Sequence, residues 1–308
     1  MAFNTPEEFR RIEDYYAGRK RVSVNDTPQT IRRASEWLRR FEDFEFAARN
    51  LRDIYGDDKS LDENRRRLLV SMLRSYVNHY ADDDVVITRA PGRLNIMGRH
   101  IDSQGGHTNL MAIDRDLYLI IGAREDRGVI LHNLNAREMP ERILDTDDVI
   151  AGYDGGDWLS FVDSDDIKNR AKKASGDWSQ YVTAPIARFQ AKYPKTLLKG
   201  MNIVAAGNIP MAAGLSSSSA VVVAVAEAIA YINDIDITPE QFVELCGEGE
   251  WYVGTRGGSA DHAAMKFAKI GKIIHVGFHP FHLVDEVPFP SDYVFLVCNS
   301  HFKAHKSG

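Results

Sequence analysis

The chain has 308 residues, a formal net charge of −6 and 44% hydrophobic residues, a profile typical of one large or two smaller globular domains. Its arginine clusters, such as Arg65–Arg67, sit among acidic residues and argue against a nucleic-acid partner. Two cysteines predict no disulfide framework, and no apolar run reaches the roughly 18 residues that cross a bilayer. The first residues lack the pattern of a signal peptide. We therefore expect a cytoplasmic protein without a membrane partner.

The first 84 residues are predicted to be helical. Thr5-Pro6-Glu7-Glu8 is a capping box with proline at the first helical position, and it predicts a helix that ends at Gly18. A second helix is predicted from Thr27-Pro28 to Gly56, and a third from about Leu61 to Tyr80. These helices contain no chemical constellation, so we expect a packing layer or an interface.

The pattern changes at Val85, where strands and helices mix without strict alternation. This order favours an α+β fold over a doubly wound sheet. The predicted strands are 85–87, 118–123, 129–132, 200–205, 272–276 and 293–297, and the predicted helices are 178–193, 217–232 and 239–252.

The segment Gly207–Ala220 is the strongest local signal. It joins an apolar strand to a helix rich in Ala and Val, and it contains four consecutive serines. Free backbone N–H groups and the helix dipole at such a helix start attract phosphate, and serine hydroxyls can bind phosphate or Mg²⁺. The segment lacks the Gly-Lys-Ser/Thr of a Walker A loop. A serine-rich helix cap is the alternative, but a cap does not require four serines.

Three motifs in this order resemble the GHMP kinase superfamily, and galactokinases in particular. Pro210-x-x-x-Gly214-Leu215-Ser-Ser-Ser resembles the second GHMP motif, which wraps the nucleotide phosphates. Arg93-Leu-Asn-Ile-Met-Gly-Arg-His-Ile-Asp102 resembles the start of the galactokinase signature, and the segment from Glu250 to Asp261 resembles the family segment ending Gly-Ile-Met-Asp-Gln. Trp178-Ser-Gln-Tyr181 is a weaker echo. The resemblance covers roughly residues 66–308.

The resemblance implies ATP and Mg²⁺ as cofactors and a role for each matched residue. Asp261 would be the catalytic base or orienting carboxylate, with an N-cap of the next helix as the structural alternative, and Arg93 would stabilise the transferred phosphate. Ser218 and Glu250 would bind the metal, although the spacing from Glu250 to Asp261 is one residue shorter than in galactokinases. The residues expected to bind the nucleotide are Gly214, Leu215, Ser216, Ser217, Ser218 and Ser219.

The expected substrate-binding residues are Arg99, His100, Asp102, Gly105 and Gly106. Arg99 departs from the family pattern, because galactokinases carry glutamate there and arginine can only donate hydrogen bonds. Arginine suits a carboxylate or phosphate, and the following residues resemble plant galacturonate kinases, so an acidic sugar is one hypothesis. The other is that Arg99 pairs with a neighbouring Asp or Glu.

Together these observations predict an α+β fold with a helical extension over 1–84 and a GHMP kinase N-terminal lobe over 85–290. The start of a C-terminal lobe that is largely missing is expected at 291–308. The expected activity is ATP-dependent phosphorylation of a sugar, at the anomeric hydroxyl. Two alternatives stay open: a catalytically silent sensor of sugar and ATP, and a GHMP kinase for a non-sugar alcohol. The uninterrupted serine loop and Asp261 favour the enzyme over the sensor.

Overall fold

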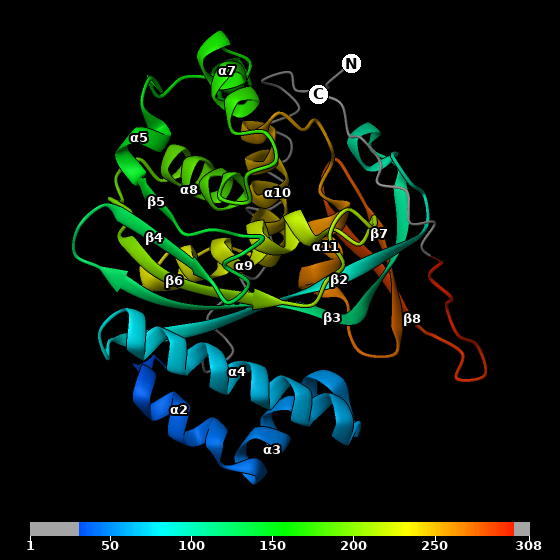
Figure 1. The fold of residues 1–308 in the computed structure, drawn as a ribbon. Coiled ribbons are helices and arrows are strands. Elements are labelled where there is room, and N and C mark those ends of the chain that lie inside the picture. The colour runs from blue at the N-terminus through cyan, green and yellow to red at the C-terminus, as the bar shows by residue number, and fades with distance from the viewer. Residues whose placement is uncertain (1–30, 299–308) are drawn as a thin grey trace.

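Two layers of helices enclose a mixed sheet in the computed structural model, which describes residues 31–298 (Figure 1). The helix predicted at 5–18 and the start of the helix predicted at 27–56 lie outside these residues. In chain order the elements are β1 (Arg32–Arg33), α2 (Ala34–Glu42), α3 (Phe44–Tyr55), α4 (Lys59–His79), β2 (Asp84–Met97), η2 (Asp102–Gln104), β3 (His107–Arg124), β4 (Gly128–Asn133), β5 (Arg142–Asp145), α5 (Thr146–Ile150), α6 (Trp158–Val162), α7 (Asp165–Lys173), α8 (Gln180–Lys192), β6 (Gly200–Gly207), α9 (Ser217–Ile232), α10 (Pro239–Glu250), η3 (Trp251–Val253), α11 (Ala260–Phe267), β7 (Lys272–Gly277) and β8 (His282–Pro288).

Strand β3 organises the sheet, whose main path runs β1-β2-β3-β6-β4-β5. It pairs with β2 along most of its length, with β6 through residues 117–124, and with β7 through residues 107–110. Strand β8 adds to β7, and β4 and β6 form the parallel pair of the described sheet. The predicted α+β class is confirmed by this mixed sheet with its irregular helix order.

Both faces of β3 are buried, which explains why the segment 117–121 is almost continuously apolar. Leu119 and Ile121 join the core formed with α8, α9 and α10. Tyr118 and Ile120 point to the other face and join the core formed with α2, α3 and α4. Fully burying each such side chain contributes about 1.5–3 kcal/mol to the stability of the fold. Helices α2, α3 and α4 are therefore part of the packing that holds the sheet.

The helical region partly matches its prediction. The helix predicted at 61–80 is confirmed as α4 (Lys59–His79). The single helix predicted up to Gly56 is wrong, because the chain breaks at Asp43 into α2 and α3. Asp43 takes an extended conformation, and its carboxylate accepts hydrogen bonds from the amides of Glu45 and Phe46, which starts a new helix.

The short strand predicted at 85–87 is confirmed as part of β2, but the prediction ends too early. Strand β2 continues through the whole Arg89–Met97 segment, because these residues pair with residues 109–118 of β3. Pro91 and Gly92 are accommodated at a register shift between Pro91 and Arg93, which is where a sheet tolerates such residues. Arg93 therefore projects from a strand.

Several segments between the motifs were not predicted, namely β5, α5, α6, α7 and β8. The strand predicted at 293–297 is wrong, since these residues have no regular secondary structure and are exposed. A strand needs a partner for its backbone groups, and no described strand pairs with this segment. No helix in the described part of the chain has the length and apolarity that a membrane span requires.

Candidate functional site

The loop between β6 and α9 is shaped by three residues with positive φ, Ala212 (55°), Gly214 (74°) and Ser216 (60°). Ser216 is the N-cap of α9, but its side chain makes no capping hydrogen bond. A Cβ on Gly214 would meet no atom within 4 Å, so the loop faces open space. The first amides of α9 are thus left without a side-chain cap, at the positive end of a 16-residue helix.

Both ends of this loop are anchored to the sheet. The amide of Asn208 donates to the Asp116 carbonyl (2.9 Å), and the Asp116 amide donates to Asn208 Oδ1 (2.9 Å). At the other end, the Arg93 amide donates to the Leu215 carbonyl (3.2 Å). The loop therefore holds its shape through β2 and β3.

Asp261, in the first turn of α11, lies at the centre of the site. Arg93 Nε donates to Asp261 Oδ1 (2.6 Å), and Arg93 Nη1 donates to the Gly214 carbonyl (2.6 Å). The Ser216 hydroxyl donates to Asp261 Oδ2, and Ser219 Oγ lies 3.5 Å from the same oxygen. The structure thus brings two of the three motifs into direct contact with Asp261.

The ionisation of Asp261 is set by opposing effects. Burial raises the pKa of this carboxyl, but the Arg93 charge and the hydrogen bonds from Arg93 and Ser216 outweigh burial, so the pKa lies below its ordinary value. The side chain keeps 27% of its surface exposed. Asp261 is therefore an ionised acceptor that a ligand can reach at neutral pH.

The segment after β2 docks next to Asp261. Asp102 Oδ2 accepts a hydrogen bond from the amide of Ala260, the residue before Asp261 (3.2 Å). The contact depends on Gly258, because a Cβ there would lie 2.5 Å from Asp102 Oδ2. Gly105 faces His279, and Gly106 packs tightly against Ile101. The galactokinase-like signature and the Asp261 segment thus form one surface.

Arg99 and His100 lie at the exposed edge of this surface. Arg99 Nε lies 3.2 Å from His100 Nε2, and His100 has a positive φ of 64°. Within residues 31–298, Arg99 makes no ion pair with a carboxylate. The alternative that Arg99 pairs with a neighbouring Asp or Glu is therefore not what the described residues show.

Tyr181, to which the sequence analysis assigned no role, interacts with both Ser218 and Glu250. Tyr181 in α8 is half-buried, and this partial burial raises the pKa of its phenol. The Glu250 carboxylate raises the pKa further, whereas a hydrogen bond with Ser218 lowers it. Glu250 Oε1 lies 3.3 Å from Nε2 of the buried His262, yet neither atom has a hydrogen-bond partner of suitable geometry. The Trp178–Tyr181 echo was the available signal for Tyr181, whereas His262 had none beyond its position next to Asp261.

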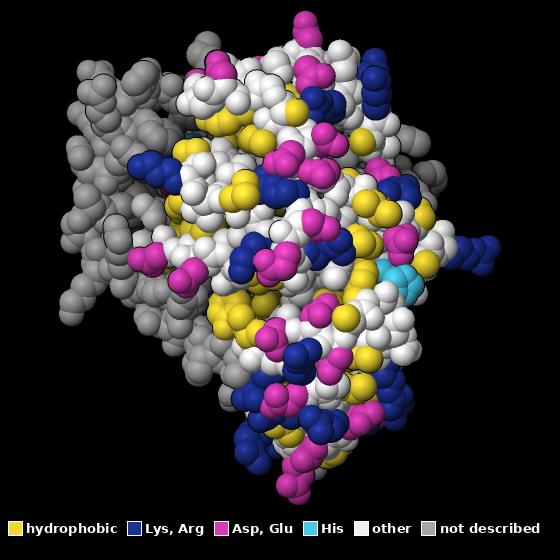
Figure 2. All heavy atoms as spheres, turned by 90° about the vertical axis from the view of Figure 1, so that its left-hand side faces the viewer, with side chains coloured by type: hydrophobic (Ala, Val, Ile, Leu, Met, Phe, Trp, Pro, Cys, Tyr) yellow, Lys and Arg dark blue, Asp and Glu magenta, His cyan; other side chains and the backbone are white. Residues whose placement is uncertain are grey.

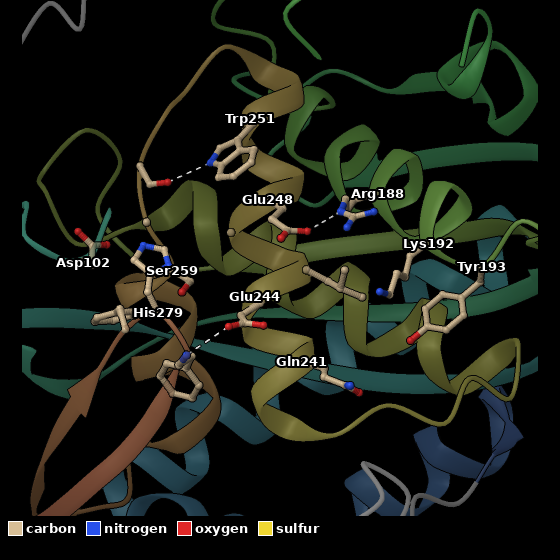
Figure 3. Close-up of a pocket in the computed structure, with 16 residues that line it drawn as sticks. Asp102, Arg188, Lys192, Tyr193, Gln241, Glu244, Glu248, Trp251, Ser259 and His279 are labelled. Atoms are coloured by element: carbon tan, nitrogen blue, oxygen red, sulfur yellow. Dashed lines mark hydrogen bonds and ion pairs between the residues drawn. The ribbon is translucent and has the colours of Figure 1, made fainter. Parts of the chain in front are cut away.

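A pocket that the sequence did not predict opens beside Asp102 (Figure 3). Residues of α8 and α10 form one wall, and the Arg188 guanidinium donates to Glu248 there (2.6 Å). Glu244 accepts a hydrogen bond from the Phe281 amide, and burial raises its pKa to about 7. Trp251 Nε1 donates to the Gly257 carbonyl (3.0 Å), which fixes the glycine-rich turn before Asp261.

Two family models match the chain over the parts that build this site. The model described as "GHMP kinases N terminal domain" matches residues 180–269, and the "Galactokinase galactose-binding signature" matches residues 74–123. The first includes the serine loop and Asp261, and the second includes Arg93, Arg99 and Asp102.

Curated relatives agree with these matches. The chain is 29% identical to a galactokinase of Dictyostelium discoideum over 82% of its own length, and 31% identical to one of Schizosaccharomyces pombe over 79%. It spans about half the length of these relatives, 46% of each. The solved structure of Lactococcus lactis galactokinase complexed with galactose resembles the fold, with a TM-score of 0.59 at 23% identity over 72% of this chain and 52% of that one.

The order of the motifs, the contacts among them and the family matches agree with one another. The fold is that of the GHMP kinase N-terminal domain, and this chain belongs to the GHMP kinase superfamily as a galactokinase-like member.

Proposed function

We propose that this chain carries most of the catalytic half of an ATP-dependent sugar kinase. The observation that carries the proposal is the position of Asp261, an ionised carboxylate held between Arg93 and the serine loop and directly beside the Asp102 segment. Phosphoryl transfer needs bound phosphates, an acceptor hydroxyl and a group that orients or deprotonates it. These requirements match the contacts around Asp261.

Each part of the site has a proposed role. The free amides of α9 and the loop Gly214–Ser219 bind the ATP phosphates. Asp261 accepts the proton of the sugar hydroxyl. The oxygen of that hydroxyl bonds to the γ-phosphorus of ATP, while the bond between this phosphorus and the ADP oxygen breaks. Arg93 holds Asp261 and places positive charge between it and the loop, where charge develops during transfer.

The residues near Ser218 fit a magnesium ion. Mg²⁺ prefers oxygen ligands, and two of them would be the Ser218 hydroxyl and Oε1 of Glu250, which accepts no hydrogen bond from the described residues. When bound, the ion would neutralise charge on the transferred phosphate. Tyr181 interacts with both residues and would hold the Ser218 hydroxyl in place through its hydrogen bond.

We propose that His100 and Asp102 bind the sugar, with the anomeric hydroxyl as the phosphate acceptor. Gly105 and Gly106 let the segment fold closely enough to present them. Arg99 extends the proposal to an acidic sugar such as a uronate, because its guanidinium is exposed and has no carboxylate partner in the described chain. Galactose is the neutral alternative.

The test is ADP release with ATP and Mg²⁺ across neutral sugars and uronic acids, compared with Asp261→Ala. The exposed Asp285→Ala serves as a matched control. Turnover of one sugar that is lost in Asp261→Ala and kept in Asp285→Ala supports the kinase. Binding of sugar and ATP without turnover favours the sensor, and turnover of mevalonate or homoserine alone favours the non-sugar kinase.

A charge exchange tests the choice of substrate. Arg99→Glu restores the residue that galactokinases carry, so we expect it to shift preference from galacturonate toward galactose by about tenfold or more. If the ratio of kcat/KM for the two sugars is unchanged, Arg99 does not select the substrate.

A further inference from the structure

Two histidines and a glutamate meet outside the site described above. His79 is the last residue of α4, His132 lies in β4, and Glu141 immediately precedes β5. One ligand atom from each lies within 4.8 Å of the other two. Figure 2 draws the face that lies on the left-hand side of Figure 1, and it shows histidine at the surface there, with acidic side chains close by. No step of the proposed phosphoryl transfer uses these residues.

The geometry of this cluster is close to that of a metal centre. His79 Nε2 lies 3.0 Å and His132 Nδ1 lies 3.8 Å from the same oxygen of Glu141, Oε2. Tetrahedral zinc, with Zn–N and Zn–O distances of about 2.0–2.2 Å, requires ligand atoms roughly 3.3 Å apart. The two separations lie on either side of that value, so side-chain adjustments of under about 1 Å would complete both contacts.

The two imidazole rings lie close together, with centroids 4.0 Å apart and planes inclined by 30°. Each directs a ring nitrogen at one carboxylate oxygen, an arrangement that a shared cation satisfies. The α4 C-terminus adds partial negative charge from its last carbonyls, which also favours a cation. Arg142 does not fill this role, because its guanidinium donates to Asp177 (2.7 Å).

We propose that His79, His132 and Glu141 form a binding site for a divalent transition-metal ion of the zinc class. Two imidazoles and one carboxylate suit zinc better than Mg²⁺, which prefers oxygen ligands, and a water would occupy the fourth position. The ion would join the end of α4 to the β4–β5 edge of the sheet. It would thereby connect α4 to the sheet through a contact separate from the hydrophobic core.

The test is titration of the untagged, metal-free protein with Zn²⁺ by calorimetry, and with Co²⁺ followed by visible absorption. We expect one ion per chain, a cobalt spectrum of tetrahedral type, and a thermal midpoint that rises with zinc and returns with a chelator. His132→Gln and Glu141→Gln should weaken zinc binding by about tenfold or more. Circular dichroism establishes that each variant is folded.

The chain offers a matched control in His107 and His275. These rings also pack together, with Nδ1 of His107 3.1 Å from Nε2 of His275, but the partner of His275 on its other side is the amide of Asn109 and not a carboxylate. His275→Gln should leave zinc binding unchanged. The proposal is overturned if wild-type protein binds no zinc stoichiometrically, or if His275→Gln loses the ion while His132→Gln keeps it.

Discussion

Arg93 and Asp261 form the contact on which the proposed site depends. They are separated by 168 positions in the chain, yet Arg93 Nε lies 2.6 Å from Asp261 Oδ1, with 15% and 27% of the two side chains exposed. The second arm of the guanidinium reaches the Gly214 carbonyl. One cation therefore joins the carboxylate to the loop that we propose binds phosphate, so the two residues should affect different measurements when they are changed separately.

The first prediction concerns the carboxylate. Asp261→Asn keeps the shape of the side chain but removes its ability to accept a proton, so we expect ADP release to fall by about 10²–10⁴-fold. Nucleotide affinity, measured by calorimetry, should change little because the loop and α9 are intact. A variant that retains near-normal turnover would show that Asp261 serves the fold and not the reaction.

The second prediction concerns the charge of Arg93. Because this guanidinium lowers the pKa of Asp261, Arg93→Met should raise that pKa. The acid limb of the kcat/KM profile should then move to higher pH. A carboxylate with a lowered pKa stabilises the folded state above its unfolded pKa and loses that effect as pH falls through the folded pKa. The free energy of unfolding of Arg93→Met should accordingly depend less on pH in the acid range, which gives a readout independent of turnover.

Motif order was enough to predict that Arg93, the serine loop and Asp261 share a site, but it could not predict their contacts. The sequence placed Ser216 among nucleotide ligands, and that role stays a prediction. In the structure its left-handed backbone turns the hydroxyl toward Asp261. Tyr181 was visible only as part of a weak echo, because its role depends on Ser218 and Glu250 coming together in space.

The fold shows the same limit. The apolar period of α4 predicted that helix well, because its buried residues recur along one side. The break at Asp43 was missed, since one carboxylate that caps α3 outweighs a continuing helical pattern. Strand β2 was predicted too short because Pro91 and Gly92 indicate a turn, whereas pairing with β3 extends the strand through a register shift.

The third prediction uses two neighbouring glycines. A Cβ at Gly258 would lie 2.5 Å from Asp102 Oδ2, whereas one at Gly257 would meet no atom within 4 Å. Gly258→Ala should displace the Asp102 carboxylate and weaken sugar binding by about tenfold or more, since overpacking of this kind costs typically 1–3 kcal/mol. Gly257→Ala should bind sugar normally. Equal affinities of the two variants by calorimetry would remove Asp102 from the proposed sugar site.

The fourth prediction concerns a buried charge cluster beneath the loop anchor. Asp116 is 1% exposed and accepts from Arg65 (2.9 Å) and from the Tyr55 hydroxyl (2.7 Å), while Arg89 Nη2 lies 2.5 Å away. Asp116→Asn leaves two arginines without their counter-charge, and breaking such a pair costs about 3–5 kcal/mol.

The matched control is Asp147, which is 66% exposed and pairs with Arg127 at the surface. Asp147→Asn should cost about 0–1 kcal/mol, because water screens exposed ion pairs. Urea denaturation gives the free energy of unfolding of both variants. Similar small losses would mean that the buried cluster contributes little to holding α3 and α4 against the sheet.

The fifth prediction concerns Glu244 in the pocket beside Asp102. Burial raises its pKa from 4.5 to about 7, so between these values the folded chain holds a proton that the unfolded chain has released. The contribution of Glu244 to the stability of the wild type should therefore fall as pH rises from about 4.5 to 7 and level off above. Glu244→Gln cannot ionise, and its side-chain oxygen can still accept from the Phe281 amide.

The variant should thus match the wild type near pH 4.5 and exceed its stability at pH 8 by up to about 3 kcal/mol, the equivalent of the shift in pKa. The exposed Glu45→Gln should show no such crossover. Thermal or urea denaturation across pH 4.5 to 8 measures the difference. If the two variants follow the same curve, Glu244 is ionised in the folded protein, and the pocket beside Asp102 presents a negative charge at neutral pH.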